Sequence, residues 1–240
     1  MESPARIYPI NEYSLTVEFG NVINEENHFE VEKLDLLLKQ KPFNGFIHAI
    51  PAYTSLCIVF DPVQVKSKWG SPFNGVFESL KNYIQELIKI PLNYQKEFRQ
   101  TKTIPVFYGD EMGPDMDFLC HKTALSPSEI IQIHSQARYK VFMMGFIPGF
   151  AYLGGMDLRL EVPRKEVPRK KVKPGSVGIA GVQTGIYPLE SPGGWQIIGR
   201  TPLKMFEAFR SPATYLQAGD WVEFRPIDAL EFQSLSQSNS

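Results

Sequence analysis

From about residue 102 onward, short runs of apolar and β-branched residues are separated every few positions by glycine or proline. Because these two residues interrupt helices and long strands, the spacing limits this part of the chain to many short strands joined by turns. Many short strands with few helices favour a closed or partly closed β-barrel. The expected strands are Lys102–Tyr108, Tyr139–Met144, Val177–Ala180, Trp195–Gly199 and Trp221–Arg225.

The preceding part of the chain has a different pattern, in which longer helices accompany the strands. Asn24 is the expected N-cap of a helix that runs to Lys39, and strands are expected over residues 6–10, 15–19, 46–51 and 56–60. Strands paired with two helices in this order favour a small α+β domain of the ferredoxin-like type. The second helix is predicted by a stripe with i, i+3, i+4 spacing that consists of Phe73, Val76, Phe77, Leu80, Ile84, Leu87 and Ile88.

A polar, aperiodic stretch from Pro91 to Lys102 separates the two patterns. Because domain boundaries fall in exposed polar linkers, we expect an α+β domain over residues 1–92 and a barrel domain over residues 93–230. The remaining residues 231–240, rich in Ser and Gln, are expected to be a frayed tail. Within the barrel domain, a capped helix is expected to begin at Ser126, and residues 201–209 are expected to form another short helix.

The charge and apolar content of the chain exclude several classes of protein. The formal net charge is −1, so no overall field attracts nucleic acid or an anionic membrane, and neither is an expected partner. Hydrophobic residues make up 43% and charged residues 21%, which argues against disorder. No apolar run could span a bilayer and no signal peptide is recognisable, so the cytoplasm is the expected location. The Cys120–His121 pair lacks further ligands nearby, and no metal site is expected.

Two segments of the barrel domain have compositions that suit a small-molecule site. Residues 145–155 alternate aromatic side chains with glycine and proline, which brings ring faces and bare backbone to a ligand. An aromatic hairpin that fills the barrel mouth is the alternative. Residues 163–174 hold six basic residues, one acid and three prolines, so a stiff loop would present guanidinium groups to a small anion. A solvated charge run and a nucleic-acid contact are the alternatives here.

Two glycine-rich segments follow. Residues 175–188 match neither a P-loop nor a dinucleotide fingerprint, and their β-branched residues favour strands in which backbone approaches closely. Residues 191–200 begin with a tight Pro-Gly-Gly turn, which is expected to expose Ser191 beside Trp195. The substrate-binding candidates of the four segments are Phe146, Phe150, Tyr152, Ser176, Gln183, Thr184, Tyr187, Ser191 and Trp195.

No complete catalytic set accompanies these segments. The sequence has no nucleophile elbow, no H-E-x-x-H zinc motif and no recognisable Ser/His/Asp order. Of the four histidines, His134 is the one that we consider for proton transfer, and a structural histidine is the favoured alternative. An anion-friendly site without its own catalytic groups indicates one subunit of a larger enzyme.

Together, the four segments resemble the B-subunit family of bacterial 5-oxoprolinase. This family includes the first subunit of allophanate hydrolase, the matching part of urea carboxylase and the sporulation histidine-kinase inhibitor. The resemblance extends to residues 51–56, 104–109, 113–115 and 133–135, and so covers nearly the whole chain. Phe107 and Asp110 depart from the cysteine and glycine that relatives often carry, which argues against a catalytic role for that loop.

The resemblance implies a fold, partners and a reaction. The fold would be an α+β domain followed by a cyclophilin-like barrel, and the partners would be a homologous C-type subunit and an A-type subunit. The complex would open 5-oxoproline to glutamate with ATP, and Arg164 and Arg169 would stabilise the charge that develops on the ring oxygen. The alternatives within the family are inhibition of a sensor histidine kinase, and a carboxyltransferase part in urea or allophanate processing, for which this chain carries no biotin domain.

Overall fold

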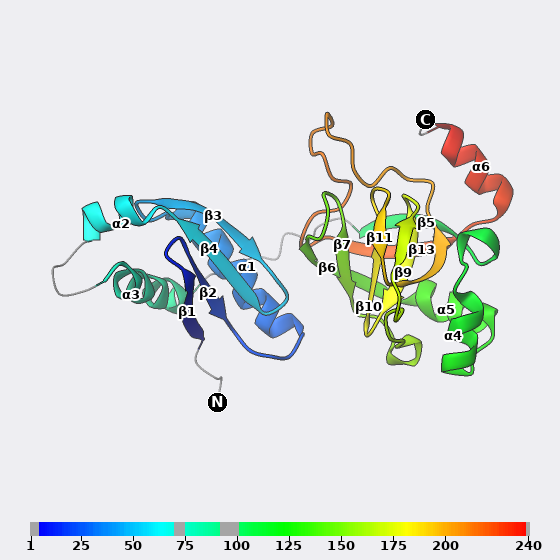
Figure 1. Ribbon diagram of the computed structural model, residues 1–240, viewed down its shortest axis with the longest axis horizontal. Coiled ribbons are helices and arrows are strands. Elements are labelled where there is room, and N and C mark those ends of the chain that lie inside the picture. Colours follow the sequence, from blue (N-terminus) through cyan, green and yellow to red (C-terminus); the bar gives the residue numbers. More distant parts are fainter. Residues whose placement is uncertain (1–4, 70–74, 92–100, 239–240) are drawn as a thin grey trace. The chain divides into compact units, whose positions relative to one another are not determined.

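The computed structural model describes residues 5–69, 75–91 and 101–238 of the 240-residue chain (Figure 1). The chain divides into two units, Met1–Glu97 and Phe98–Ser240, and each has its own hydrophobic core. The boundary expected near residues 92 and 93 lies outside the described residues. Of the helices in the described ranges, none has the length and apolar character needed to cross a bilayer.

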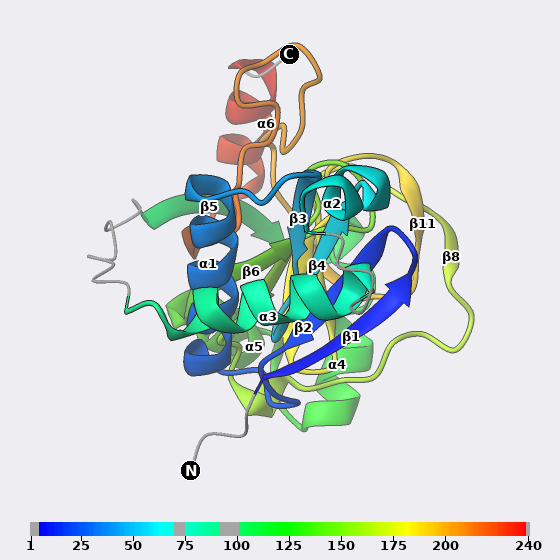
Figure 2. The same ribbon diagram turned by 90° about the vertical axis from the view of Figure 1, so that its left-hand side faces the viewer.

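Residues 5–91 form a four-stranded antiparallel sheet with helices packed on one face. The elements are β1 (Arg6–Asn11), β2 (Ser14–Glu18), α1 (Glu25–Gln40), β3 (Phe46–Pro51), β4 (Ser55–Phe60), α2 (Pro62–Trp69) and α3 (Val76–Lys89), and the strand order is β1-β2-β4-β3. Alternate residues of β4 (Leu56, Ile58 and Phe60) point into the core. Asn24 caps α1 by accepting a hydrogen bond from Asn27 N at 2.8 Å, as predicted. Figure 2 shows α1 and α3 crossing beside the strands.

The predicted strands and the two longer helices of this unit are confirmed. The buried residues of α3 belong to the predicted stripe, although Phe73 of that stripe lies outside the described residues. Helix α2 is an addition: Asp61 Oδ1 accepts hydrogen bonds from Val63 N at 2.9 Å and Gln64 N at 3.3 Å, which starts a helix where only the end of a strand was expected. The ferredoxin-like name is not confirmed, because the elements follow the order ββαββαα rather than βαββαβ.

Within residues 101–238, seven strands close into a barrel in the order β10-β7-β6-β13-β5-β12-β9 (Figure 1). Strands β5 and β13 pair in parallel, and the other neighbours in the barrel are antiparallel. The barrel predicted from the short glycine-punctuated runs is thereby confirmed. Strands β8 and β11 form a separate two-stranded ribbon. The bounds are β5 Thr101–Tyr108, β6 Arg138–Met144, β7 Ala151–Gly154, β8 Arg169–Val172, β9 Ser176–Ala180, β10 Gln183–Ile186, β11 Ser191–Gly193, β12 Gln196–Arg200 and β13 Trp221–Pro226.

Short helices accompany the barrel, namely η1 (Asp110–Met112), α4 (Met116–Thr123), α5 (Pro127–Gln136) and η2 (Leu158–Leu160). Helix α5 begins with the predicted capping box. Glu129 N donates to Ser126 Oγ at 3.3 Å, and Ser126 N donates to Glu129 Oε2 at 2.8 Å. Because α5 packs against β13, its start signal also decides where one side of the barrel is covered.

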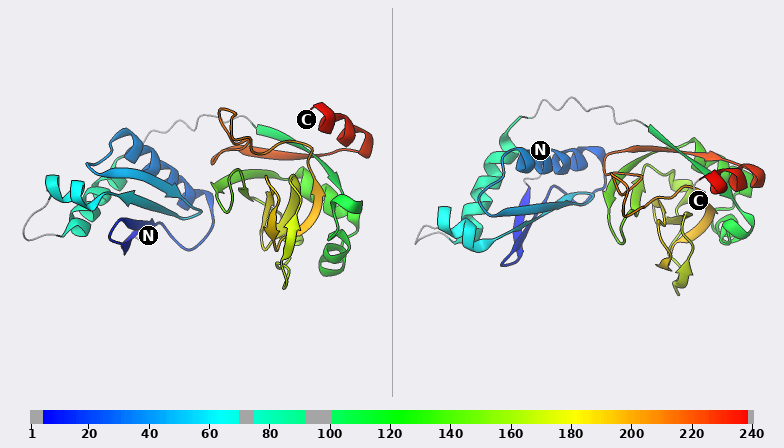
Figure 3. Two further views of the ribbon diagram at one scale, coloured as in Figure 1. Left: turned by 45° about the horizontal axis from the view of Figure 1, so that its top comes forward. Right: turned by 90° about the horizontal axis from the view of Figure 1, so that it is seen from above.

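The short helix expected over residues 201–209 is absent from the structure. Instead, Glu207 N donates to Ala213 O and Tyr215 N donates to Met205 O, both at 2.8 Å. These bonds pair the segment with the residues that follow it, so its backbone groups are satisfied without a helix. In Figure 3 the segment is the extended loop coloured orange.

The expectation of a frayed tail is wrong for residues 231–238. They belong to helix α6 (Ala229–Ser238), and residues 239 and 240 lie outside the described residues. The ring of Phe232 lies 6.2 Å from that of Phe107 in β5, and Glu231 forms an ion pair with Arg225. These contacts with the barrel order a segment whose composition alone is typical of a mobile end.

Candidate functional site

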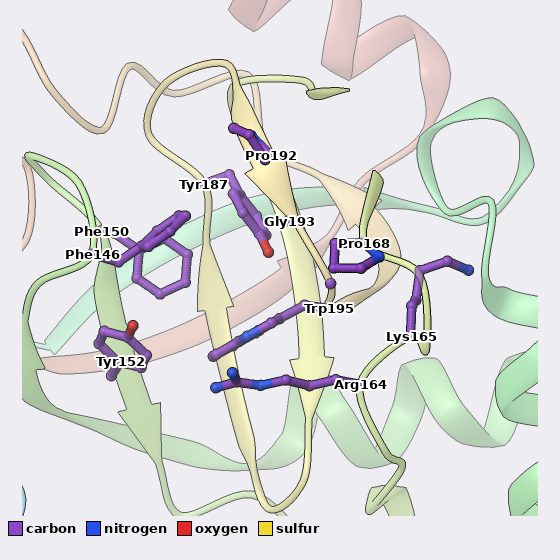
Figure 4. A pocket seen from close by; sticks show the side chains of 11 residues that line it. Phe146, Phe150, Tyr152, Arg164, Lys165, Pro168, Tyr187, Pro192, Gly193 and Trp195 are labelled. Atoms are coloured by element: carbon purple, nitrogen blue, oxygen red, sulfur yellow. The ribbon is translucent and has the colours of Figure 1, made fainter. Parts of the chain in front are cut away.

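An open cavity of about 300 Å³ lies against the outside of the barrel (Figure 4). Aromatic rings form one side of it and a basic segment forms the other. It is lined by the predicted residues Phe146, Phe150, Tyr152, Arg164, Tyr187 and Trp195, together with Lys165, Pro168, Pro192, Gly193 and Gly194. All four segments that stand out by their composition thus contribute to one pocket, and residues 175–188 contribute only Tyr187.

Strand alternation explains why the aromatic side chains face outward. In β7, Ala151 and Leu153 belong to the barrel core, so Tyr152 between them points away from it. In the same way, Ile186 of β10 is buried inside the barrel, and the next residue, Tyr187, lies outside. The outward side chains form a second hydrophobic cluster, separate from the barrel core, which consists of Phe150, Val172, Ala180, Tyr187, Trp195 and Ile197.

Glycines in the strands beneath this cluster make room for its rings. A Cβ atom at Gly185 would lie 2.9 Å from Cζ3 of Trp195 and 3.1 Å from Cζ of Phe150. A Cβ atom at Gly193 would collide with the ring and hydroxyl of Tyr187. Cβ contacts below 3.0 Å essentially do not occur and one of 3.1 Å is unusually tight, so the rings lie this close to the backbone because no Cβ is present. The glycine-rich segments were predicted to allow a close approach to their backbone. In the structure, the groups that approach it are the protein's own aromatic rings.

Phe150 is the centre of the aromatic cluster. It is 1% exposed, and its ring centroid lies 4.8 Å from that of Tyr152, 5.2 Å from that of Tyr187 and 5.4 Å from that of Trp195. All three pairs meet edge to face, the arrangement that aromatic quadrupoles prefer. Phe146 packs on Phe150 at 5.6 Å but is 59% exposed. The pocket therefore has a buried aromatic base and one exposed ring at its rim.

The basic segment before β8 forms the other side of the pocket, and hydrogen bonds hold its backbone on both sides of Arg164. On one side, Pro163 O accepts a hydrogen bond from Gln196 Nε2 at 3.1 Å. On the other, Lys165 N donates to Gly194 O at 2.7 Å. Because Gln196 begins β12 and Gly194 lies in the connection between β11 and β12, these bonds fix the backbone of Arg164 relative to the barrel.

Arg164 supplies the positive charge of the pocket. Figure 4 shows its side chain reaching across the pocket below Trp195, toward Tyr152. Burial raises the pKa of Tyr152 and of Tyr187, and the charge of Arg164 opposes this rise without cancelling it. Both phenols are therefore protonated at neutral pH and can donate hydrogen bonds. Among the described residues Arg164 has no ion-pair partner, so its guanidinium is available to an anionic ligand.

Asp115 engages the other two basic side chains of this wall. Its Oδ1 accepts hydrogen bonds from Arg169 Nη2 at 2.7 Å and Lys165 Nζ at 3.1 Å, and its Oδ2 accepts one from Ile197 N at 2.6 Å. Burial favours the neutral carboxyl, but these hydrogen bonds outweigh burial and lower the pKa of Asp115 below its ordinary value. Arg169, predicted to act beside Arg164, does not line the pocket: its Nη2 is bound to Asp115, and its Nη1 is buried without a hydrogen-bond partner in the described part of the chain.

The remaining substrate-binding candidates do not line the pocket. Ser176 is buried at the start of β9, and Gln183 is half-buried at the start of β10. Thr184 lies inside the barrel, on the opposite face of β10 from the pocket. Ser191 is buried rather than exposed, because its segment pairs with Val172 as strand β11 instead of ending in a turn.

His134 also lies inside the barrel. Its Nδ1 is 2.8 Å from the Tyr108 hydroxyl, and its Nε2 is 3.0 Å from Thr184 Oγ1. Because the Thr184 hydroxyl donates to Gly178 O at 3.0 Å, it accepts from Nε2–H, and Nδ1 accepts from Tyr108. Burial lowers the pKa of His134 to about 3, so the imidazole is neutral. The structure thus places His134 away from the pocket, in the structural role that was the favoured alternative.

Sequence reasoning overlooked several residues of this site. Some of the lining residues lie in segments whose composition indicated a site, although these residues were not predicted individually. They are Lys165, Pro168, Gly193 and Gly194. Asp115 belongs to residues 113–115, which share in the family resemblance, but the sequence does not indicate its partners, because it lies 50 residues from Lys165 and 54 residues from Arg169. Only the folded barrel brings these charges together.

A second cavity, of about 470 Å³, opens beside Tyr108 and is lined by Asp110 and Asp117 among others. In the part of the chain that the structure describes, no group of three or more His, Cys, Asp or Glu side chains could hold a metal ion. The first pocket is the stronger candidate, because a guanidinium beside aromatic rings is a specific arrangement for a planar or ring-shaped anion.

A family model described as "Carboxyltransferase domain, subdomain C and D" matches residues 5–216. The chain is 40% identical over 236 residues to the B subunit of 5-oxoprolinase from Bacillus subtilis (strain 168), and the match covers 98% of each protein. It is 50% identical over 154 residues to the B subunit of 5-oxoprolinase from Haemophilus influenzae, covering 63% of this chain and 72% of that protein.

Among solved structures, the crystal structure of TTHA0988 matches with a TM-score of 0.75 and 30% sequence identity over 90% of this chain. The present chain spans only 40% of the TTHA0988 chain, so the matched part there belongs to a longer polypeptide. The family model and the Bacillus relative both extend over most of the chain, in agreement with the resemblance that its motifs showed. The chain therefore belongs to the family of 5-oxoprolinase B subunits, within the carboxyltransferase-domain proteins.

Proposed function

We propose that this chain is the B subunit of an ATP-dependent 5-oxoprolinase that opens the lactam of 5-oxoproline to give glutamate. The opening adds one water across the ring amide: the C–N bond breaks, the carbonyl carbon takes the hydroxyl, and the ring nitrogen takes the proton. The names and the near-complete match of the Bacillus relative support this proposal. We also propose a cytoplasmic location and the cyclophilin-like name for the barrel, which its closed sheet supports.

One observation carries the proposal, namely the Arg164 guanidinium in an aromatic pocket, where no carboxylate of the described residues pairs with it. 5-Oxoproline is a small ring with a single carboxylate, which a guanidinium can hold through two parallel hydrogen bonds. The ring would then lie against Trp195, and the hydroxyls of Tyr152 and Tyr187 would donate to the lactam oxygen. Arg164 takes this role without Arg169. The pocket thus supports a part in binding and orienting the substrate.

ATP is the second substrate that the family resemblance implies, and the residues of this pocket do not fit it. A magnesium-bound triphosphate is held by main-chain N–H groups of a glycine-rich loop, by a lysine and by oxygen ligands to the metal. Here the pocket offers aromatic rings, prolines, two glycines and two basic side chains, and Lys165 is paired with Asp115. We therefore assign ATP mainly to another polypeptide of the complex.

The partners in this proposal are a homologous C-type subunit and an A-type subunit. The relatives are named as subunits, and the matched part of TTHA0988 is accompanied by further sequence in the same chain. Both facts support a protein that works beside other polypeptide segments. The chain alone is therefore expected neither to hydrolyse ATP nor to open 5-oxoproline.

The test is reconstitution of the three subunits, with measurement of 5-oxoproline-dependent ATP hydrolysis and glutamate formation. Arg164→Ala should lower kcat/KM by roughly ten- to hundredfold, because a charge-assisted contact contributes about 1.5–3 kcal/mol. Arg159→Ala is the matched control, since Arg159 is bound to Asp157 and does not line the pocket, and it should keep wild-type activity.

Three results would contradict this proposal at different levels. Wild-type kcat/KM in Arg164→Ala would refute the site while leaving the reaction intact. Absence of 5-oxoproline-dependent ATP hydrolysis in every combination of subunits would refute the function itself and would favour the kinase-inhibitor hypothesis. Turnover by the isolated chain would refute the division of labour between subunits.

A further inference from the structure

Residues 163–174 hold six basic residues, and a single buried carboxylate, that of Asp115, pairs with two of them, Lys165 and Arg169. We infer that Asp115 is the positioning residue of this site. It pairs with Lys165 and Arg169, so that of the two basic residues lining the pocket, Arg164 is the one without an ion-pair partner among the described residues. The inference rests on the proposed function, because it takes this pocket as the place where the anionic substrate binds.

The barrel backbone fixes the position of this carboxylate. Asp115 N donates to Ile197 O at 3.0 Å, and Ile197 N donates to Asp115 Oδ2 at 2.6 Å, so the residue is bracketed to β12. Asp115 is 4% exposed and precedes helix α4. A buried carboxylate cannot leave such a set of donors without leaving buried polar groups unpaired. The position of the carboxylate is therefore fixed, and the flexible side chains of Lys165 and Arg169 are held in place by pairing with it.

Two ion pairs transmit this fixed position to the pocket wall. Arg169 and Lys165 meet Asp115 Oδ1 at 2.7 and 3.1 Å, and their side chains are 26% and 29% exposed. Figure 4 shows the Lys165 side chain directed away from Arg164. The backbone of Arg169 pairs with Gly193 between β8 and β11, so the same carboxylate is linked to the glycine-rich wall as well.

Loss of the charge on Asp115 would release both cations while leaving the main backbone contact in place. An asparagine at this position can still accept the hydrogen bond from Ile197 N, but it cannot neutralise Lys165 or Arg169. The freed cations would repel Arg164 and displace its guanidinium from the position in which it meets the substrate carboxylate, because like charges in a partly buried site are poorly screened. Substrate binding should weaken although the fold persists.

The test compares Asp115→Asn with wild type in two assays. In the reconstituted complex, Asp115→Asn should raise the KM for 5-oxoproline about tenfold, with kcat changed less than about threefold and the KM for ATP unchanged. In the isolated full chain, trypsin should cleave about tenfold faster after the basic residues 164, 165, 169, 170 and 171. Without its ion pairs to residue 115, this segment would unfold locally more often and expose its peptide bonds to the protease.

Asp220→Asn is the matched control. Asp220 is 6% exposed, pairs with Lys102 Nζ at 2.9 Å and accepts a hydrogen bond from Gln217 N at 2.9 Å, but it does not line the pocket. It should change neither the KM for 5-oxoproline nor the cleavage rate of the wall. If Asp115→Asn does not fold, Arg169→Gln removes one of the two ion pairs that tie the basic segment to Asp115, and trypsin should then cleave after residues 164 and 165 about threefold faster than in wild type.

The two assays separate failure of this inference from failure of the proposed function. Wild-type cleavage of the wall in Asp115→Asn overturns the inference, and so does an unchanged KM for 5-oxoproline in an active complex. If the wild-type complex has no 5-oxoproline activity, the proposed function fails, and the cleavage assay alone then decides whether Asp115 holds the wall. Faster cleavage in Asp115→Asn but not in Asp220→Asn supports the inference.

Discussion

Acid is expected to destabilise the barrel through His134. The imidazole is fully buried between Tyr108 and Thr184, and burial lowers its pKa from the ordinary 6.5 to about 3. In the unfolded chain the same side chain takes up a proton near pH 6.5, so below this pH the unfolded state binds more protons than the folded state. The contribution of the neutral histidine to stability is therefore complete above pH 6.5 and is lost as the pH falls toward 3.

The pKa shift of His134 sets the size of this effect. Between the two pKa values, each pH unit costs about 1.4 kcal/mol of the free energy of unfolding. The loss is therefore about 2 kcal/mol at pH 5 and about 4–5 kcal/mol at pH 3. Since domains are typically stable by about 5–15 kcal/mol, this one side chain is a large share of the acid sensitivity of the barrel.

The assay is urea unfolding between pH 7 and pH 4.5 with and without His134→Gln, both in a Trp69→Phe background, so that the fluorescence comes from Trp195 and Trp221 of the barrel. Glutamine can accept from Tyr108 and donate to Thr184 but does not titrate, so the variant should lose about 2 kcal/mol less than wild type between pH 7 and pH 5. His121→Gln, at an exposed histidine, should follow the wild-type curve. Parallel pH dependence in wild type and His134→Gln would refute the reasoning.

Two further predictions concern the packing around the pocket and the C-terminal helix. Gly185→Ala should raise the KM for 5-oxoproline several-fold in the complex, because its Cβ would lie 2.9 Å from both the Trp195 ring and the Ala151 carbonyl oxygen of β7, so that the ring and the pairing of β7 with β10 must shift. Gly75→Ala, where a Cβ meets nothing within 4 Å, should not raise it, and equal KM values in both variants would contradict the argument. Phe232→Ala removes the ring contact with Phe107, so hydrogen exchange should become faster for amides 229–238 only. Unchanged exchange there would show that other contacts hold α6.

Features that depend on a few neighbouring residues could be predicted from the sequence alone. Asn24 and Ser126 are N-caps in the structure because a cap bonds to a backbone group three residues away, within the reach of a local pattern. Strands β5, β6, β9, β12 and β13 of the barrel were predicted for the same reason, since glycine and proline act on the backbone where they stand, whereas β7 and β10 were not among the strands predicted by range. The segments that surround the pocket were recognisable from their aromatic, basic and glycine content.

Which residues of these segments share the pocket was decided by the tertiary structure. Tyr187 and Thr184 belong to one glycine-rich segment, yet one lies outside the barrel and the other inside, because closure of the sheet gives alternate residues opposite faces. Arg164 and Arg169 were equivalent in the sequence, and only the fold brings Asp115 from 54 residues away to Arg169. A local pattern reports on bonds within a few residues, whereas the partner of a charge or a ring depends on segments that meet only after the barrel has closed.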